Sequence, residues 1–230
     1  MPWNKGFTKH THPSLMSLSN TIKSKHIDNF KNWRLQQQKL GRVPNEKQSF
    51  KKSKALAELI GVVLGDGNIS RFPRTERLVI TGNSNNIGFY KRYAVIVNKI
   101  FHKQPTVSKL TKTNAVRISI YQKYISKRIE VPCGGRRDLT IQIPLWITQN
   151  KNYLISILRG LFEAEGSLSI HLKTYTYNFQ FSNRNDSLLK FVADSLVILG
   201  FHPEVRTYYV RLRRKSEVAR FKNLIKFRVY

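Results

Sequence analysis

The chain has 230 residues, of which 41 are Lys or Arg and 13 are Asp or Glu, so its formal net charge is +28 at pH 7, while 40% of its residues are hydrophobic. This combination excludes a disordered basic tail, which would lack the apolar residues for a core, and it favours a folded protein that binds a polyanion such as nucleic acid. Cys133 is the only cysteine, which excludes disulfides within the chain and cysteine-rich zinc sites and favours a reducing, intracellular compartment, either a prokaryotic cytoplasm or an organelle.

The apolar stretches of the chain are short. The longest, such as residues 59–64, fall far below the roughly 20 residues that span a bilayer. We therefore expect no transmembrane helix and no membrane partner.

Residues 1–54 form a basic N-terminal arm with 12 Lys or Arg and two acids, a net charge of +10. A helix is predicted to begin at Pro13, because apolar residues recur from there to Trp33 at roughly helical spacing, and to end before Gly41. Two interpretations of the arm remain open. It is either a solvated, Lys-rich helix that docks through its apolar residues, or a clamp on the DNA backbone.

Beyond residue 55 the chain repeats itself. The helical pattern of residues 56–67 recurs in residues 155–166 at an offset of 99, and the strand pattern of residues 78–83 recurs in residues 179–184 at an offset of 101. Two shorter matches follow at offsets of 100 and 94: Phe101-His102 with Phe201-His202, and Val116-Arg117-Ile118 with Val210-Arg211-Leu212. The repeat is too long for a solenoid and indicates two pseudo-symmetric halves, residues 55–148 and 149–230.

Each half is predicted to be an α+β unit in the order helix, two strands, helix, two strands, helix. Apolar and polar residues alternate along the strands, so that one face of each sheet is apolar and the other carries basic, amide and hydroxyl side chains with almost no acids. Such side chains contact bases and phosphates, although a polar outer face is also the default for a solvated antiparallel sheet. The candidate DNA-binding residues are Ser70, Arg74, Arg77, Arg117, Ser119, Ser169, His171, Lys173, Gln180, Arg211 and Arg213.

The scarce acids gather at the ends of the two repeated helices. Asp66, Glu163 and Glu165 lie in the last turns, directly before Gly67 and Gly166, and each glycine fits the left-handed position that follows many helices. A carboxylate there faces the negative end of the helix dipole, which costs up to ~1 kcal/mol. A bound divalent cation offsets that cost, and Mg²⁺ prefers one or two carboxylates together with water and phosphate oxygens.

The same two helices carry small residues four positions apart, which lie on one helix face. These residues are Gly61 and Gly65 in the first helix and Gly160 and Ala164 in the second. If the helices pack through these faces, Asp66 and Glu165 meet at the base of the two sheets. The alternative is a pair of core helices whose terminal acids face water, and the duplicated order of small residues, acid and glycine argues against it.

Two segments resemble the paired motifs of the LAGLIDADG homing endonucleases in their single-chain form: LIGVVLGDG at residues 59–67 and LRGLFEAEG at residues 158–166. The resemblance extends from about residue 55 to the C-terminus. It implies two αββαββα units, antiparallel sheets that form a saddle over DNA, and motif helices packed at the centre through Gly61 and Gly160. It also implies one catalytic acid from each motif, Asp66 and Glu165.

The function that this resemblance implies is a sequence-specific, metal-dependent endonuclease encoded by a mobile element, in an intron or a free-standing gene. The monomer would make a staggered double-strand break in a partly palindromic DNA target of roughly 20 base pairs. Two or three Mg²⁺ ions, for which Mn²⁺ substitutes, would be held by Asp66, Glu165 and the backbone of Gly65 and Ala164. Two alternatives stay open: an RNA maturase that assists intron splicing, and a catalytically inactive DNA-binding regulator on the same scaffold.

Two positions depart from the family pattern. The sixth motif position, often acidic, is Leu64 in the first half and Glu163 in the second, and the strand-end position often held by Gln is Gly82 in the first half. The candidates for supporting the catalytic acids are Asn183, Arg184 and Lys151. An attenuated cleavage rate is the expected consequence of an incomplete supporting set.

Overall fold

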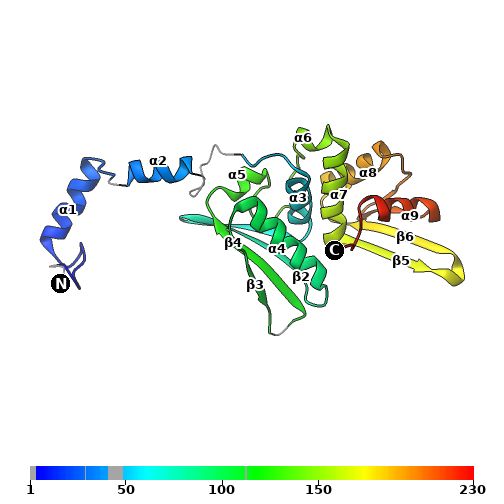
Figure 1. Cartoon of the computed structure of the whole chain (residues 1–230), viewed down its shortest axis with the longest axis horizontal. Coiled ribbons are helices and arrows are strands. Elements are labelled where there is room, and N and C mark those ends of the chain that lie inside the picture. The colour runs from blue at the N-terminus through cyan, green and yellow to red at the C-terminus, as the bar shows by residue number, and fades with distance from the viewer. Residues whose placement is uncertain (1–3, 29, 41–48, 112) are drawn as a thin grey trace. The chain divides into compact units, whose positions relative to one another are not determined.

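The computed structural model describes residues 4–28, 30–40, 49–111 and 113–230, and the chain divides into two compact units, Met1–Asn45 and Glu46–Tyr230. The first unit holds helices α1 (Pro13–Ser24) and α2 (Lys31–Lys39) (Figure 1). The predicted helix does begin at Pro13, but it is two helices, because His26 adopts a φ of 47° that a continuing helix cannot. The predicted end before Gly41 lies outside the described residues, although α2 stops at Lys39.

The second unit contains both predicted halves, each with the expected order of elements. The first half comprises α3 (Lys54–Asp66), β1 (Gly67–Phe72), β2 (Thr75–Asn83), α4 (Ile87–Phe101), β3 (Thr106–Lys109), β4 (Ala115–Gln122) and α5 (Ile125–Ile129). A linker with the short helix α6 (Leu145–Thr148) leads to the second half. That half comprises α7 (Lys151–Glu165), β5 (Gly166–His171), the 3-10 turn η1 (Leu172–Thr174), β6 (Thr176–Ser182), α8 (Asp186–Ile198), β7 (Glu204–Arg206), β8 (Tyr209–Leu212) and α9 (Lys215–Leu224).

The strands form two four-stranded antiparallel sheets with orders β1-β2-β4-β3 and β5-β6-β8-β7. Within the second unit, α3 and α7 stand side by side at the centre, with one sheet on each side (Figure 1). The prediction of an α+β fold with two equivalent units and central motif helices is therefore confirmed.

Strand register corrects one detail of the repeat. Gly67 pairs with Ile80 and Gly166 with Phe181, which confirms the offset of 101 between β2 and β6. Ile118 lies opposite Ile80, however, and Val210 lies opposite Phe181, so β4 and β8 correspond at an offset of 92 and not 94. A shift of two residues leaves every side chain on its original face, and apolar alternation alone could not reveal it.

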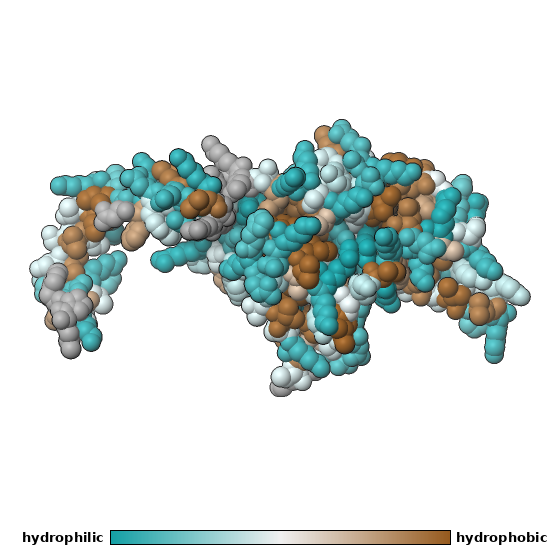
Figure 2. All heavy atoms as spheres, in the orientation of Figure 1, coloured by the Kyte–Doolittle hydropathy of each residue, from teal (hydrophilic) through white to brown (hydrophobic). Residues whose placement is uncertain are grey.

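The core of the second unit is built on the two motif helices. Residues 56–64 of α3 are all buried, and one face of each sheet packs against the helices. In the second half, Phe162 of α7 contacts Phe179 and Phe221 with ring centroids 4.9 Å apart in both cases. Hydrophilic residues cover most of the face seen in Figure 2. In the described part of the chain, no helix has the length and apolar character needed to span a membrane.

Candidate active site and nucleic-acid interface

The motif helices touch backbone to backbone. A Cβ atom added to Gly61 would lie 2.2 Å from the carbonyl oxygen of Ile157, and one added to Gly160 would lie 2.1 Å from the carbonyl oxygen of Glu58. Closer to the helix ends, a Cβ on Gly65 would lie 2.5 Å from that of Ala164. These contacts bring the C-terminal ends of α3 and α7 together, and with them Asp66 and Glu165.

Each motif helix passes directly into the first strand of its sheet. Gly67 has φ −89° and ψ 156°, and Gly166 has φ −83° and ψ 138°, so the expectation of left-handed glycines is wrong. Glycine is required for a different reason. A Cβ at Gly67 would lie 2.7 Å from the carbonyl oxygen of Val63, and one at Gly166 would lie 2.2 Å from that of Phe162.

Burial raises the pKa of both terminal carboxyls, and the charge of Glu165 adds to the shift of Asp66. Although Asp66 keeps contact with solvent, the atoms packed around its carboxyl and the negative charge of Glu165 raise the pKa of Asp66 to about 7. Burial also raises the pKa of Glu165. Neither carboxylate has a hydrogen-bond or ion-pair partner among the described residues. The site therefore holds two acids that form no ion pair within the described part of the chain.

This donor set fits hard divalent cations. The described residues contain no cluster of three or more His, Cys, Asp or Glu side chains that could hold a metal alone. The two carboxylates can be joined by the backbone carbonyls of Gly65 and Ala164, because carbonyls in the last turn of a helix lack intrahelical partners. A cation bound by these groups would keep free coordination positions for water and a phosphate oxygen.

Metal-free stability should depend on Asp66. Its folded-state pKa lies above the unfolded value, so the folded state binds the proton more tightly between about pH 4 and 7, and stability rises as pH falls through that range. In EDTA at pH 8, Asp66→Asn should raise the melting temperature by about 2–4 °C. This corresponds to a gain of about 1 kcal/mol in unfolding free energy, discounted because Asp66 contacts solvent. The variant should also lose most of this dependence of stability on pH. Thermal unfolding from pH 5 to 8 tests this, and an equal slope in both proteins would contradict it.

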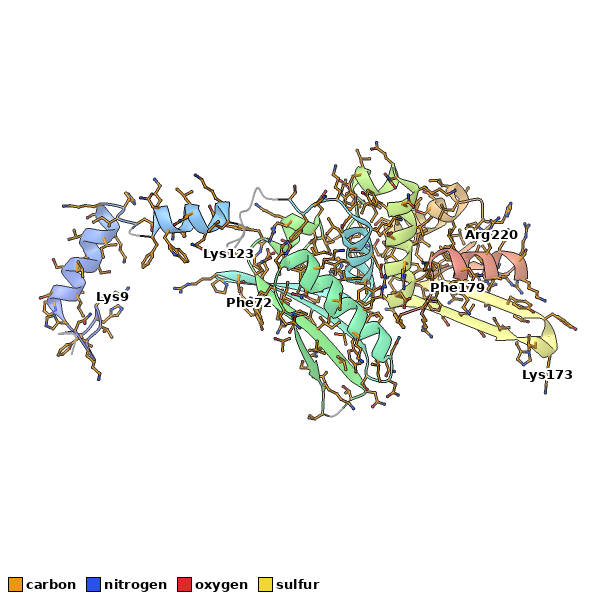
Figure 3. All side chains as sticks on the ribbon, in the orientation of Figure 1. Lys9, Phe72, Lys123, Lys173, Phe179 and Arg220 are labelled. Carbon is orange, nitrogen blue, oxygen red and sulfur yellow. The ribbon has the colours of Figure 1, made fainter. Side chains whose placement is uncertain are left out.

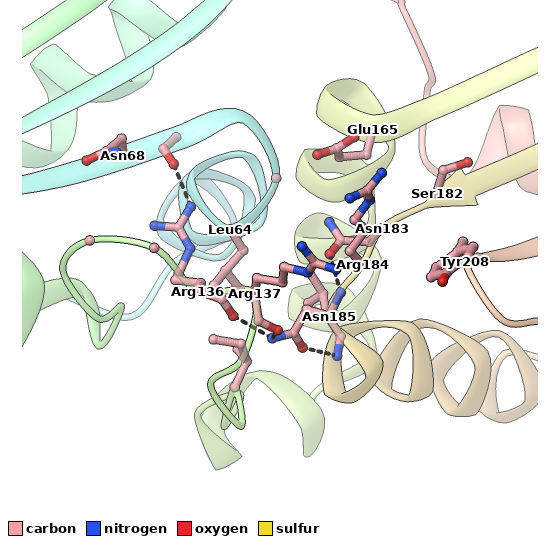
Figure 4. Close-up of a pocket in the computed structure, with 16 residues that line it drawn as sticks. Leu64, Asn68, Arg136, Arg137, Glu165, Ser182, Asn183, Arg184, Asn185 and Tyr208 are labelled. Atoms are coloured by element: carbon pink, nitrogen blue, oxygen red, sulfur yellow. Dashed lines mark hydrogen bonds between the residues drawn. The ribbon is translucent and has the colours of Figure 1, made fainter.

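A cavity of about 740 Å³ lies beside Glu165 and is lined by both halves and by the linker between them. Figure 4 shows Arg136 and Arg137 on the linker side and Glu165, Asn183 and Arg184 on the other. None of these arginines has a carboxylate within ion-pair distance in the described chain. The cavity is thus cationic apart from Glu165, which suits a phosphate group.

Arg136 ties the linker to the end of α3. Its Nη2 donates hydrogen bonds to the carbonyl oxygens of Val63 at 2.8 Å and Gly67 at 2.5 Å, while its buried Nη1 has no partner in the described chain. Burial lowers the pKa of Arg136 from its usual value. A cation at this position opposes the negative end of the α3 dipole next to Asp66.

Asn185 fastens the linker to the second half. Its Oδ1 accepts from the backbone N–H of Leu188 at 2.9 Å, which caps α8. Its Nδ2 donates to the carbonyl oxygens of Arg136, Arg137 and Leu139 at 2.6, 3.1 and 2.7 Å. One buried amide therefore positions the linker arginines against the strand end that carries Asn183 and Arg184.

Replacing Asn185 by Asp should separate these two roles. Asp caps a helix as well as Asn does, but it would turn a carboxylate oxygen toward three carbonyl oxygens. We expect Asn185→Asp to lose about 2–4 kcal/mol of unfolding free energy. Asn150→Asp is the matched control, because exposed Asn150 caps α7 through Oδ1 alone. Its unfolding free energy, measured by denaturant unfolding, should equal that of the wild-type protein. Equal stability of the two variants would argue against the Asn185 contacts.

Lys151 and Glu163 lie away from the acid pair. Lys151 is the first residue of α7, about 21 Å along the helix from Glu165, so the expectation that it supports the site is wrong. Glu163 accepts hydrogen bonds from the backbone N–H of Arg228 and the hydroxyl of Tyr230, both at 2.6 Å. The acid at the sixth motif position thus holds the C-terminal segment.

The strand-end positions differ between the halves. A Cβ on Gly82 would lie 2.6 Å from the ring of Phe89, so a side chain there requires the buried Phe89 ring to move. Asn183 lines the cavity beside Glu165, and its Oδ1 accepts from the backbone N–H of Asn185 at 2.9 Å. At the strand-end position, therefore, only the Glu165 half carries a polar side chain.

Most candidate DNA-binding residues lie on the sheet faces that no helix covers. These are Ser70, Arg77, Arg117 and Ser119 on the first sheet and Ser169, His171, Gln180 and Arg211 on the second. Arg74 lies in the β1–β2 turn, Lys173 at the tip of the β5–β6 hairpin (Figure 3), and Arg213 just after β8.

The second sheet carries an acid on its open face. Glu204 accepts hydrogen bonds from Arg206 at 2.8 Å and from Arg211 at 3.0 and 3.1 Å. The hydrogen bonds from Arg211, and to a lesser extent that from Arg206, lower the pKa of Glu204 to about 2. Arg211 is thus already paired within the protein.

Sequence reasoning missed Arg136, Arg137 and Asn185. The two arginines lie in the linker, which has no counterpart in the repeat and no periodicity. Asn185 follows the matched strand pattern and is typical of a helix cap, but nothing in the sequence indicates its bonds to the linker.

The sequence matches no family model and no curated protein. The fold, however, matches solved structures. A structure of mesophilic variants of the homing endonuclease I-DmoI is 17% identical, with a TM-score of 0.52 over 75% of this chain and 94% of that one. I-DmoI in complex with DNA and Mn is also 17% identical, with a TM-score of 0.50 over 75% of this chain and 96% of the I-DmoI chain. The N-terminal LAGLIDADG domain of DUF199/WhiA is 16% identical, with a TM-score of 0.52 over 75% and 80%.

Proposed function

Since the chain has the LAGLIDADG fold, we propose that it is a sequence-specific DNA endonuclease that hydrolyses both strands with divalent metal ions. The fold alone does not decide this, because a homing endonuclease and a WhiA domain both carry it. The observation that supports catalysis is the pair of carboxylates Asp66 and Glu165, which are held together at the helix ends and form no ion pair in the described chain. A protein that only binds DNA gains nothing from carboxylates placed next to phosphates.

The chain supplies position and charge to the reaction. Asp66 and Glu165, with the backbone oxygens of Gly65 and Ala164, would hold Mg²⁺, for which Mn²⁺ substitutes. When bound, the metal supplies activation of water and stabilisation of the leaving 3′ oxygen. Arg136 and Arg184 bind the phosphate that enters the cavity beside Glu165. The open sheet faces bind the major groove on either side, over roughly 20 base pairs.

The DNA complexes of I-DmoI with Mn, with Ca and with Mg are in keeping with this proposal. We propose that the protein acts as a monomer, because one chain contains both carboxylates and both open sheets, and that it works inside the cell on the uninterrupted insertion site of its own gene.

The test is incubation of that insertion-site DNA with the protein and Mg²⁺. Cleavage of both strands with a short 3′ stagger is expected, and affinity should fall steeply with salt as phosphate contacts release counterions. Tight binding without cleavage in Mg²⁺ or Mn²⁺ would instead identify a DNA-binding regulator. Preferential binding of intron RNA over the DNA site would favour a maturase.

A further inference from the structure

The open faces of the two sheets each contain a buried polar atom with no hydrogen-bond partner in the described part of the chain. One is Nε of Arg77 on β2, and the other is Oδ1 of Asn178 on β6. Unpaired buried polar atoms are rare in folded proteins, and a missing ligand is one explanation for them.

The two residues occupy the same place in the two halves. Arg77 pairs across the sheet with Ser70, three residues beyond the Gly67–Ile80 pair that starts the first sheet. Asn178 pairs with Ser169, three residues beyond the Gly166–Phe181 pair. The pseudo-twofold axis therefore relates Arg77 to Asn178, and both should face equivalent base pairs of the two half-sites, away from the central ones.

Arg77 is held in place by aromatic rings and not by an acid. Its guanidinium carbon lies 5.6 Å from the ring centroid of Phe72 and 6.0 Å from that of Tyr121, its direct cross-strand neighbour. Arg211 on the other sheet differs, because it donates two hydrogen bonds to Glu204. These cation–π contacts restrain the Arg77 guanidinium and leave its terminal N–H groups for a ligand, which lowers the entropy lost on binding.

The chemistry of the two side chains selects different bases. In the major groove, Arg donates two hydrogen bonds to O6 and N7 of guanine, whereas Asn accepts from N6 and donates to N7 of adenine. Asn178 requires a donor for its unpaired Oδ1, and the adenine amino group is one.

We propose that Arg77 reads a guanine in one half-site and that Asn178 reads an adenine at the equivalent position of the other. The target then departs from twofold symmetry at this pair of positions. The inference rests on the DNA binding proposed above, but not on cleavage.

Selection of bound sequences from a random duplex library, in EDTA to prevent metal-dependent cleavage, tests the inference. The wild-type protein should select guanine at one position and adenine at the equivalent one, each preferred about tenfold. Asn178→Arg should change the adenine preference to guanine, and Arg77→Asn should change guanine to adenine. A new preference is a result that damage to the fold cannot produce.

Two further variants separate base reading from charge. Phe72→Leu keeps the guanidinium but removes one of its two cation–π contacts, so the guanine preference should weaken several-fold. Arg71→Asn is the matched control, because Arg71 is highly exposed and alternates to the opposite side of β1, and it should leave the selected bases unchanged.

Three results would overturn the inference: a wild-type protein that selects no site, exchanged variants that keep the wild-type base preferences, or variants that weaken binding equally for all sequences. If the wild-type protein selects a site but does not cut it in Mg²⁺, the endonuclease proposal fails, and the base preferences still decide this inference.

Discussion

Asp66→Asn and Glu165→Gln should each abolish the linear product of DNA cleavage, with a rate loss of about a thousandfold or more. Each substitution keeps the size of the side chain and removes one of the two charges that would hold Mg²⁺. The proteins should stay folded, because neither carboxylate has a hydrogen-bond partner among the described residues to lose. Conversion of supercoiled plasmid carrying the target to nicked and linear forms measures the effect.

The same two substitutions should not weaken DNA binding, although they abolish cleavage. The two carboxylates repel the phosphates that the cationic cavity attracts, so in EDTA both variants should bind the target as tightly as the wild-type protein or several-fold more tightly. Glu163→Gln is the matched control, since Glu163 lies on α7 but bonds to the C-terminal segment, and its cleavage per folded molecule should stay within a few-fold of wild type. Cleavage retained by both acid variants would show that other groups hold the metal.

Gly61→Ala and Gly160→Ala should each destabilise the second unit by about 3 kcal/mol or more, which lowers its melting temperature by about 6–12 °C. In an exposed helix the same change would be stabilising by up to ~1 kcal/mol, because alanine has the higher helix propensity. Here the new methyl group would lie 2.2 Å from the carbonyl oxygen of Ile157, or 2.1 Å from that of Glu58, and backbone atoms cannot yield unless the helices separate.

Separation of the helices should also impair cleavage in the fraction that remains folded, because it moves Asp66 away from Glu165. Gly135→Ala is the control, since no atom lies within 4 Å of its added methyl group and its φ is not in the left-handed region. It should change the unfolding free energy by no more than about 0.5 kcal/mol. A wild-type melting temperature for Gly61→Ala would contradict the backbone contact between the helices.

Features that depend on local patterns were accessible from the sequence. Hydrophobic periodicity located the motif helices and the strands, and the duplicated order of small residue, acid and glycine placed Asp66 and Glu165 at the helix ends. These patterns arise because a helix or strand buries one face at a fixed period, wherever its neighbours lie. The alternation of the strands likewise assigned Ser70, Arg77 and Gln180 to the uncovered faces.

Features that depend on contacts between distant segments needed the tertiary structure. The 94-residue offset of the last strand pair was wrong by two residues, since a shift of two preserves every face and only hydrogen-bond register distinguishes the alternatives. Gly67 and Gly166 were expected to be left-handed caps, but each lies where a side chain would meet the preceding helix turn. Lys151 lies 14 residues before Glu165 on the same helix, and the rise per residue alone separates them by about 21 Å, so helix geometry already argued against a supporting role.

The sequence by itself determined that two equivalent helices each end in a carboxylate, because that order is local and occurs twice. Only the tertiary structure decided what surrounds those carboxylates. The buried amide of Asn185 holds the linker arginines at the cavity, Arg136 bonds to the end of α3 near Asp66, and the Phe89 ring crowds position 82. It also decided that Arg77 and Asn178 are equivalent. The physical reason is that the linker contacts and the equivalence of Arg77 and Asn178 depend on packing between segments roughly 50 to 100 residues apart, which no periodicity within a segment encodes.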